Sequence, residues 1–160
     1  MPNQAANDSA TQARPVNPEK TTLNVTRHFK APPALVYQAW TDPKKIVHWF
    51  GPDAGPVLSA EADVCVGGRY RVVFCTENGD EHDVSGLYRE VVPNEKLVFT
   101  WSWRTTAERV SLVTVTMKAE GDGTLFSLTH EKLFDEETRD SHLYGWTGCI
   151  DKLGRWLEAA

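Results

Sequence analysis

A chain of 160 residues suffices for one domain with its own hydrophobic core and is too short for two of ordinary size. The hydrophobic fraction of 41% and the charged fraction of 24% are typical of a globular protein and exclude a disordered one. The 17 Lys and Arg against 22 Asp and Glu, with no basic run and no long apolar run, predict neither a nucleic-acid partner nor a membrane span.

The first 20 residues are expected to form a flexible tail. They contain three prolines and no Leu, Ile or aromatic residue, so they bury too little to offset the entropy of ordering. No stretch of residues 1–20 has the apolar character of a secretory signal, and we therefore expect a cytoplasmic location. The folded domain is predicted to cover residues 21–160.

The domain is expected to open with one strand and two short helices. Apolar residues alternate over residues 23–29, as in a strand that buries one face. Pro33 suits the first turn of a short helix, and apolar residues follow it at helical spacing. Asp42 then predicts the N-cap of a second short helix over residues 44–49.

A series of six strands is expected next, since alternating segments are separated by turn residues such as Asn78-Gly79 and Gly121. The short connections between these strands favour antiparallel pairing of strands that follow one another in the sequence. Ser111, a polar residue at the start of an apolar stripe, is expected at the sheet edge. The predicted strands are residues 57–63, 68–76, 82–91, 96–104, 110–120 and 124–131.

A long amphipathic helix is predicted from Glu136 to about Glu158, with Asp135 as its cap. Its apolar residues recur at steps of three and four, namely Leu143, Trp146, Ile150, Leu153 and Leu157. The order of elements therefore predicts an α+β fold: a curved antiparallel sheet of about seven strands, with two short helices after the first strand and the long C-terminal helix over the concave face.

Two patterns suggest that the space between sheet and helix is hollow. Gly145 and Gly148 lie about one turn apart on the final helix, where glycine destabilises and so calls for a packing or clearance reason. The inward stripes also carry aromatic residues with polar tips, although these could simply form a large core. The lining predicted for a ligand site is Trp49, Tyr70, Trp101, Trp103, His130 and Trp146.

The chain also resembles a known family, through short motifs that recur in order along most of its length. They include Ala31-Pro32-Pro33, Ala39-Trp40-Thr41-Asp42-Pro43, Trp49-Phe50-Gly51-Pro52, Thr100-Trp101, Thr129-His130-Glu131 and Gly145-Trp146. With these motifs the chain is similar to single-domain proteins related to the C-terminal domain of the activator of the heat-shock-protein-90 ATPase.

That group belongs to the START-like (SRPBCC) helix-grip superfamily, which also contains birch-pollen-type allergens and polyketide cyclases. The resemblance spans about residues 23–158 and implies a helix-grip fold with a cavity for a lipid-like, aromatic or polyketide-like ligand. It implies no catalytic residue. We expect no chaperone partner, because the two-domain activator is similar to this chain in one domain only.

The residues with acid–base chemistry form no recognisable constellation. The available candidates are His130, Glu131, Asp63 and His142. The three cysteines lack a Cys-x-x-Cys pair, and neither a metal nor a cofactor is expected. The acidic stretch over residues 77–83 could attract a cation, but it is interpreted as a solvated hairpin end.

Three hypotheses about function follow. The preferred one is a protein, not an enzyme, that binds a small hydrophobic or aromatic ligand between sheet and helix. The second is a cyclase-like or hydrolase-like enzyme in which His130 moves a proton. The third is a chaperone interaction module. A homodimer is a further expectation, because an exposed strand edge can pair with the same edge of a second copy.

Overall fold

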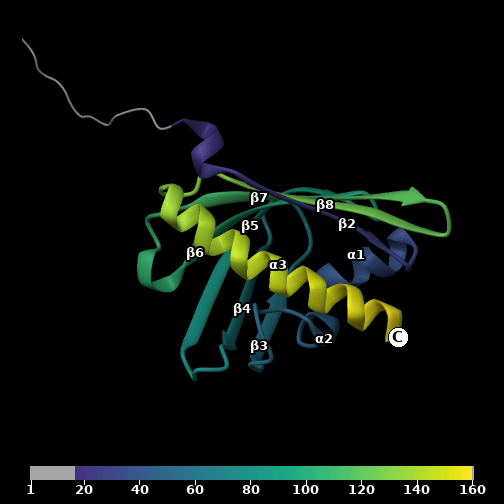
Figure 1. Ribbon diagram of the computed structural model, residues 1–160, viewed down its shortest axis with the longest axis horizontal. Coiled ribbons are helices and arrows are strands. Elements are labelled where there is room, and N and C mark those ends of the chain that lie inside the picture. The colour runs from purple at the N-terminus through teal and green to yellow at the C-terminus, as the bar shows by residue number, and fades with distance from the viewer. Residues whose placement is uncertain (1–16, 160) are drawn as a thin grey trace, which may run out of the picture.

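The computed structural model describes residues 17–159, which form a curved sheet and a long helix that crosses it (Figure 1). Along the chain the elements are η2 (Pro18–Thr21), β2 (Leu23–Phe29), α1 (Pro33–Thr41), α2 (Pro43–Ile46), β3 (Val57–Ala62), β4 (Arg69–Cys75), β5 (Glu81–Val92), β6 (Lys96–Trp103), η3 (Arg104–Thr106), β7 (Ser111–Glu120), β8 (Gly123–Glu131) and α3 (Glu136–Ala159). The predicted α+β helix-grip architecture is confirmed.

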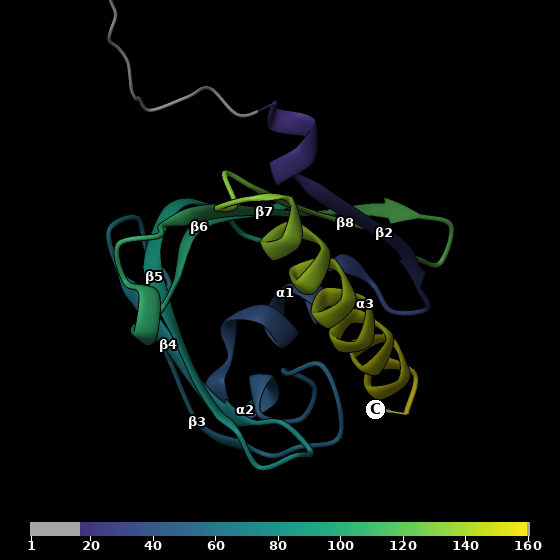
Figure 2. The same cartoon turned by 60° about the vertical axis from the view of Figure 1, so that its left-hand side comes forward.

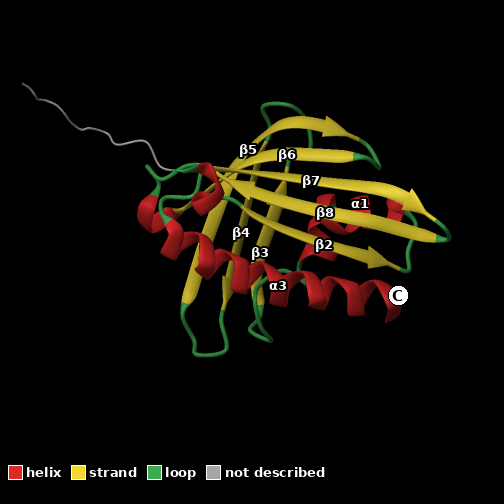
Figure 3. Ribbon diagram, turned by 45° about the horizontal axis from the view of Figure 1, so that its top comes forward, coloured by secondary structure: helices red, strands yellow, loops and turns green. Residues whose placement is uncertain are grey.

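Seven antiparallel strands form one sheet in the order β2-β8-β7-β6-β5-β4-β3. Figure 2 shows the sheet curling around α3 and the two short helices, and Figure 3 shows β2, β8 and β7 lying along the length of α3. Each of the six strands predicted after residue 56 agrees with the observed bounds to within one residue. The strands β2 and β3 form the two edges, and a homodimer through either edge stays a prediction.

The short helices begin where the sequence indicates. Pro33 occupies the first turn of α1, and the side chain of Asp42 accepts a hydrogen bond of 2.9 Å from the backbone N–H of Lys44 at the start of α2. The helix α2 ends earlier than predicted, at Ile46, and the chain continues as turns through Trp49. This compact corner holds the residues that follow it, Phe50–Asp53, against α3.

The helix α3 begins as predicted, since Asp135 accepts a 2.8 Å hydrogen bond from the backbone N–H of Thr138. Its buried face consists of Trp146, Cys149, Ile150, Leu153 and Leu157. Leu143 was expected on that face but is 37% exposed. The buried apolar stripe therefore begins later along α3, at Trp146, than the sequence pattern predicts.

Ser111 was expected at the sheet edge, and this prediction is wrong. The strand β7 lies between β6 and β8 in the sheet, and Ser111 is buried. Its hydroxyl donates to the carbonyl oxygen of Trp101 at 3.2 Å and lies 2.7 Å from Nε2 of His130. A polar residue is tolerated here because its hydrogen-bonding groups find partners inside the protein.

The core is densely aromatic beneath β2, β8 and β7. Trp40 of α1 stacks on Phe126 with ring centroids 5.7 Å apart, and Phe126 contacts Phe29 at 5.1 Å. Ile150 and Leu153 of α3 belong to the same cluster and are fully buried. This half of the helix–sheet interior is filled with side chains.

The predicted N-terminal tail falls mostly on residues 1–16, which lie outside the described residues. The end of that segment, Pro18–Thr21, forms the short helix η2. Arg139 of α3 donates hydrogen bonds to the carbonyl oxygens of Glu19 (3.0 Å) and Thr22 (3.3 Å). The described structure therefore includes the last residues of the predicted tail, and the domain boundary at residue 21 stays a prediction. No helix within residues 17–159 has the length and apolar character needed to cross a membrane.

Candidate functional site

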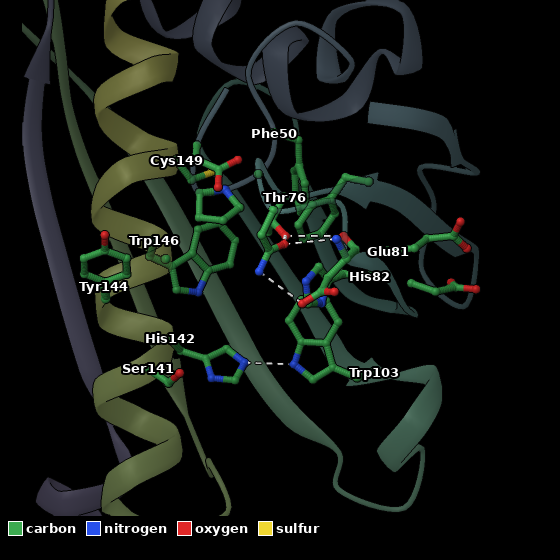
Figure 4. A pocket seen from close by; sticks show the side chains of 18 of the residues that line it. Phe50, Thr76, Glu81, His82, Trp103, Ser141, His142, Tyr144, Trp146 and Cys149 are labelled. Carbon is green, nitrogen blue, oxygen red and sulfur yellow. Dashed lines mark hydrogen bonds between the residues drawn. The ribbon is translucent and has the colours of Figure 1, made fainter. Parts of the chain in front are cut away.

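A hollow of about 1040 Å³ lies between the N-terminal half of α3 and the opposite end of the sheet. Its walls come from α3, the β4–β5 hairpin, the end of β6 and the loop after α2 (Figure 4). It forms because the curved sheet carries β4 and β5 away from α3, whereas β2 stays packed against the helix. A volume of this size lies at the upper limit of the range of about 300–1,000 Å³ found for small-molecule sites.

The apolar part of the hollow is made almost entirely of aromatic rings. Trp146 of α3 lies 5.0 Å from Trp101 of β6, and Trp101 in turn meets Trp103 edge-on at 5.3 Å (centroid distances). Phe50 and Phe74 complete this surface, with their centroids 5.7 Å apart. Phe50, Phe74, Trp101 and Trp146 are each 7% exposed or less, so the half-buried Trp103 is the ring most open to the hollow.

Three of the six predicted ligand-lining residues lie on the hollow, namely Trp101, Trp103 and Trp146. The other three are inside the core. Trp49 is 1% exposed and its indole N–H donates to the carbonyl oxygen of Ala39 at 2.9 Å. Tyr70 donates to the carbonyl oxygen of Thr100 at 2.6 Å, and burial raises its pKa well above the ordinary value.

His130 is the third predicted residue that does not line the hollow, and it is completely buried behind the rings of Trp101 and Trp146, which belong to the aromatic wall of the hollow. Trp146 donates from Nε1 to its Nδ1 at 3.0 Å, so a neutral ring carries its proton on Nε2 and donates it to Ser111 at 2.7 Å. Burial, and secondly the neighbouring His142, lower the pKa of His130 well below the ordinary value. His130 is therefore a neutral, fully bonded group that holds α3 to the sheet.

His142 lies closer to the opening and links the two walls of the hollow. Its Nδ1–H donates to the carbonyl oxygen of Thr138 at 2.8 Å, and its Nε2 accepts from the indole N–H of Trp103 at 3.1 Å (Figure 4). Burial lowers the pKa of His142, although the bond to Thr138 acts in the opposite direction. The neutral ring is the form that can accept from Trp103.

The other candidates for acid–base chemistry lie elsewhere. Asp63 is exposed, Glu131 is half-buried, and neither lines the hollow. Cys149 does line it, but burial raises the pKa of its thiol to about 12, so it stays protonated. In the described part of the chain, no group of three or more His, Cys, Asp or Glu residues is placed to hold a metal ion.

The sequence reasoning missed the polar side of the hollow. Asp53, from the loop after α2, accepts backbone hydrogen bonds from Gly55 (2.9 Å) and Glu77 (3.0 Å) and so joins this loop to the β4–β5 hairpin. Burial acts to raise the pKa of Asp53, but those two N–H groups, with the charges of Lys152 and His82, hold it below the ordinary value. Only the acidity of residues 77–83 signalled this wall in the sequence.

The two glycines of α3 have different roles, which substitution by alanine should separate. A Cβ at Gly148 would overlap the carbonyl oxygen of Pro52, whereas one at Gly145 would meet only the Pro52 Cβ, at 3.9 Å. We expect Gly148→Ala to lower the free energy of unfolding by about 1–3 kcal/mol through this clash. Gly145→Ala should raise it by about 0.5–1 kcal/mol, the ordinary gain in a helix.

Urea denaturation followed by tryptophan fluorescence measures both effects. Because the two positions are on the same helix and receive the same side chain, Gly145→Ala is the matched control for Gly148→Ala. Equal changes in the two variants would contradict the assignment of Gly148 to close packing and of Gly145 to the open wall.

Solved structures with the same architecture come from several bacteria. One protein from Chromobacterium violaceum has a TM-score of 0.79 at 28% sequence identity, over 86% of this chain and 97% of its own. The AHSA1 protein of Silicibacter pomeroyi has a TM-score of 0.75 at 27% identity, over 86% and 98%. CalU16 from Micromonospora echinospora, at 24% identity and a TM-score of 0.64 over 85% and 75%, shows the fold alone.

The sequence comparisons agree with the structural ones. Residues 30–158 match the family model described as "Activator of Hsp90 ATPase homolog 1-like protein". No curated protein matches the chain. The matched segment includes every residue that lines the hollow.

Proposed function

The chain belongs to the Activator of Hsp90 ATPase homolog 1-like family, and from this premise and the aromatic hollow we propose that it binds a small hydrophobic or aromatic molecule between α3 and the sheet. The observation that carries the proposal is the hollow of about 1040 Å³. Trp103, which is half-buried, gives the ligand the larger contact surface, whereas Trp101 and Trp146 line the hollow with only 5% and 4% of their surface exposed.

The residues behind the wall support this function indirectly. Trp49, Tyr70 and His130 use their polar atoms within the protein, and they fix the positions of the elements that carry the wall. A wall held in this way is preformed, which reduces the entropy lost when a ligand binds.

The enzymatic alternative has little support in this geometry. A general base must reach the proton that it abstracts, and His130 is separated from the hollow by the rings of Trp101 and Trp146, with both ring nitrogens engaged. The proposal is therefore binding without a reaction. The chaperone alternative is tested separately, by asking whether the protein retains the heat-shock protein 90 of its own cell in a pull-down.

Filling the hollow provides the direct test. Gly145 lines it, and its Cβ position is open, so Gly145→Phe can place a ring in the space without moving the backbone. We expect the wild type to bind the neutral hydrophobic dye Nile red with a fluorescence increase, and Gly145→Phe to weaken this binding at least about tenfold because the space is occupied.

Gly145→Ala is the matched control, since it adds one methyl group and should leave dye affinity within about twofold. Absence of dye binding by the wild type at tens of micromolar protein would contradict the proposed function. Equal affinity of the wild type and Gly145→Phe would place the dye elsewhere on the molecule.

A further inference from the structure

The polar rim of the hollow is strongly acidic. Five carboxylates line it among the described residues, namely those of Asp53, Glu77, Asp80, Glu81 and Asp83. In the same described lining, Arg104 carries the one guanidinium group and no lysine is present. His82 and His142 also line it. Residues 77–81 are exposed at the end of the β4–β5 hairpin, as the solvated-end interpretation expects, and they also form one rim of the hollow.

Two of the five carboxylates are already matched by protein groups. Asp83 forms ion pairs with Arg71 at 2.8 Å and with Arg104 at 3.4 Å. The positive charge of Arg104 is therefore already paired with a carboxylate of the protein. Asp53 accepts backbone hydrogen bonds and lies near Lys152, whose ammonium donates to the carbonyl oxygens of Phe50 and Asp53. These groups hold the rim together.

The remaining three carboxylates form no ion pair among the described residues, although Asp80 accepts a 3.2 Å hydrogen bond from the side-chain amide of Asn78 and Glu77 lies in the field of Lys152. Glu77, Asp80 and Glu81 are exposed on the β4–β5 hairpin, and none forms an ion pair within 4.0 Å in the part of the chain that the structure describes. Glu81 precedes the inward His82 in β5 and points away from the rings in Figure 4, so the charges at the mouth of the aromatic hollow are those of Glu77 and Asp80. Field lines from like charges around a cavity of low dielectric raise the local concentration of the opposite charge.

The aromatic inner surface of the hollow also favours positively charged groups. The faces of Trp and Phe rings carry negative electrostatic potential and attract ammonium groups, by about 0.5–2 kcal/mol depending on desolvation. Trp103 is half-buried on the hollow and lies beside the same hairpin, with its ring centroid 5.8 Å from that of His82. A cation here meets carboxylates on one side and ring faces on the other.

We propose that the hollow selects ligands that combine an aromatic or apolar body with a protonated amine, and rejects those that carry a carboxylate or phosphate. This inference rests on the proposed function and adds the charge of the ligand. The body lies on Trp101, Trp103 and Trp146, and the ammonium group faces Glu77 and Asp80. An anionic group would meet the rim charges, while Lys152 is occupied by backbone carbonyls.

Three probes of nearly the same shape test the selection. They are 1-naphthylmethylamine, which is a cation at pH 7.5, the neutral 1-naphthalenemethanol, and the anion 1-naphthoate. Isothermal titration calorimetry at pH 7.5 and low salt should give the amine at least about fivefold higher affinity than the alcohol, and the alcohol higher affinity than the carboxylate. The preference for the amine should decrease as salt is added.

Paired substitutions locate the selection on the rim. Glu77→Gln with Asp80→Asn should lower the affinity for the amine about fivefold and leave that for the alcohol within about twofold, since exposed charges contribute modestly each. Glu95→Gln with Asp122→Asn removes the same number of exposed carboxylates from the turns after β5 and β7, away from the hollow. This control pair should leave the affinities for all three probes nearly unchanged.

The outcomes separate this inference from the proposed function. Equal affinities for the amine and the alcohol, or stronger binding of the carboxylate, would overturn the charge selection and leave hydrophobic binding intact. Loss of amine affinity in the control pair would mean that overall charge, not the rim, governs binding, and would also overturn it. Failure of all three probes and of Nile red to bind would overturn both.

Discussion

Acidification from pH 7 to pH 5 is expected to reduce the free energy of unfolding steeply, by up to about 2.7 kcal/mol per pH unit. Burial lowers the pKa values of both His130 and His142 in the folded protein. In the unfolded chain both rings take up protons near the ordinary pKa of about 6.5. Below that pH the unfolded state binds more protons, so stability is complete above about pH 6.5 and is lost as the pH falls.

Protonation would also break specific hydrogen bonds. A proton on Nδ1 of His130 would face the indole N–H of Trp146, and a proton on Nε2 of His142 would face that of Trp103. Both bonds join α3 to the sheet, the first to β8 and the second to β6. We therefore expect the wall to loosen at the same pH at which the molecule loses stability.

Urea denaturation at several pH values between 7.5 and 5, followed by tryptophan fluorescence, measures the slope. His142→Gln keeps an acceptor for Trp103 and removes one titrating group, so the slope should fall to about 1.4 kcal/mol per pH unit. A profile that is flat between pH 7 and pH 5 in the wild type would show that neither ring resists protonation in the folded protein.

Most of the fold could be predicted from local sequence patterns because strands, turns and caps have local causes. The alternation of apolar residues and the positive-φ turn glycines Gly79 and Gly121 determined the strand bounds to within one residue. Asp42 and Asp135 marked two helix starts through their ability to accept a backbone hydrogen bond. Each of these signals acts over a few residues.

Which residues line the hollow depends on the curvature of the sheet, and no local sequence pattern determines that curvature. Alternation placed His130 and Trp103 on inward faces but did not show how deep each would lie, and the first is inside the core whereas the second is at the opening. The same curvature brings the β4–β5 hairpin, which carries Glu77, to the side of the hollow opposite α3. Polar residues at a hairpin tip therefore became one wall of the hollow.

Ser111 was misjudged for a related reason. A polar residue in an apolar stripe indicates either an exposed edge or a buried partner, and the choice depends on which strand lies beside it. Its partners, Trp101 and His130, are on β6 and β8. These strands directly precede and follow β7 in the sequence, but the apolar pattern does not give the register that brings the side chains of Trp101 and His130 beside Ser111.

Trp146→Ala is expected to lower the free energy of unfolding by about 3–5 kcal/mol, the range typical for truncation of a large buried aromatic residue. Trp146 is 4% exposed, and its ring lies 5.0 Å from that of Trp101 and 6.0 Å from that of Trp40. The substitution also leaves Nδ1 of His130 without its donor. Packing and hydrogen bonding are thus lost together.

Trp146→Phe separates the two contributions. It keeps most of the ring and removes the N–H, so we expect a loss of about 1–3 kcal/mol from the unpaired Nδ1 of His130. In a His130→Leu background there is no acceptor to leave unpaired, and the further effect of Trp146→Phe should shrink accordingly. Urea denaturation of the four proteins gives the coupling energy of the pair.

The outcome decides how the wall of the hollow is held. A coupling near zero would mean that Trp146 is fixed by ring packing alone, and that His130 is a passive core residue. A coupling of about 1 kcal/mol or more would mean that the buried Ser111–His130–Trp146 network sets the position of this ring. In that case Trp146→Phe should also weaken Nile red binding, because the ring would no longer be held in the orientation that the ligand meets.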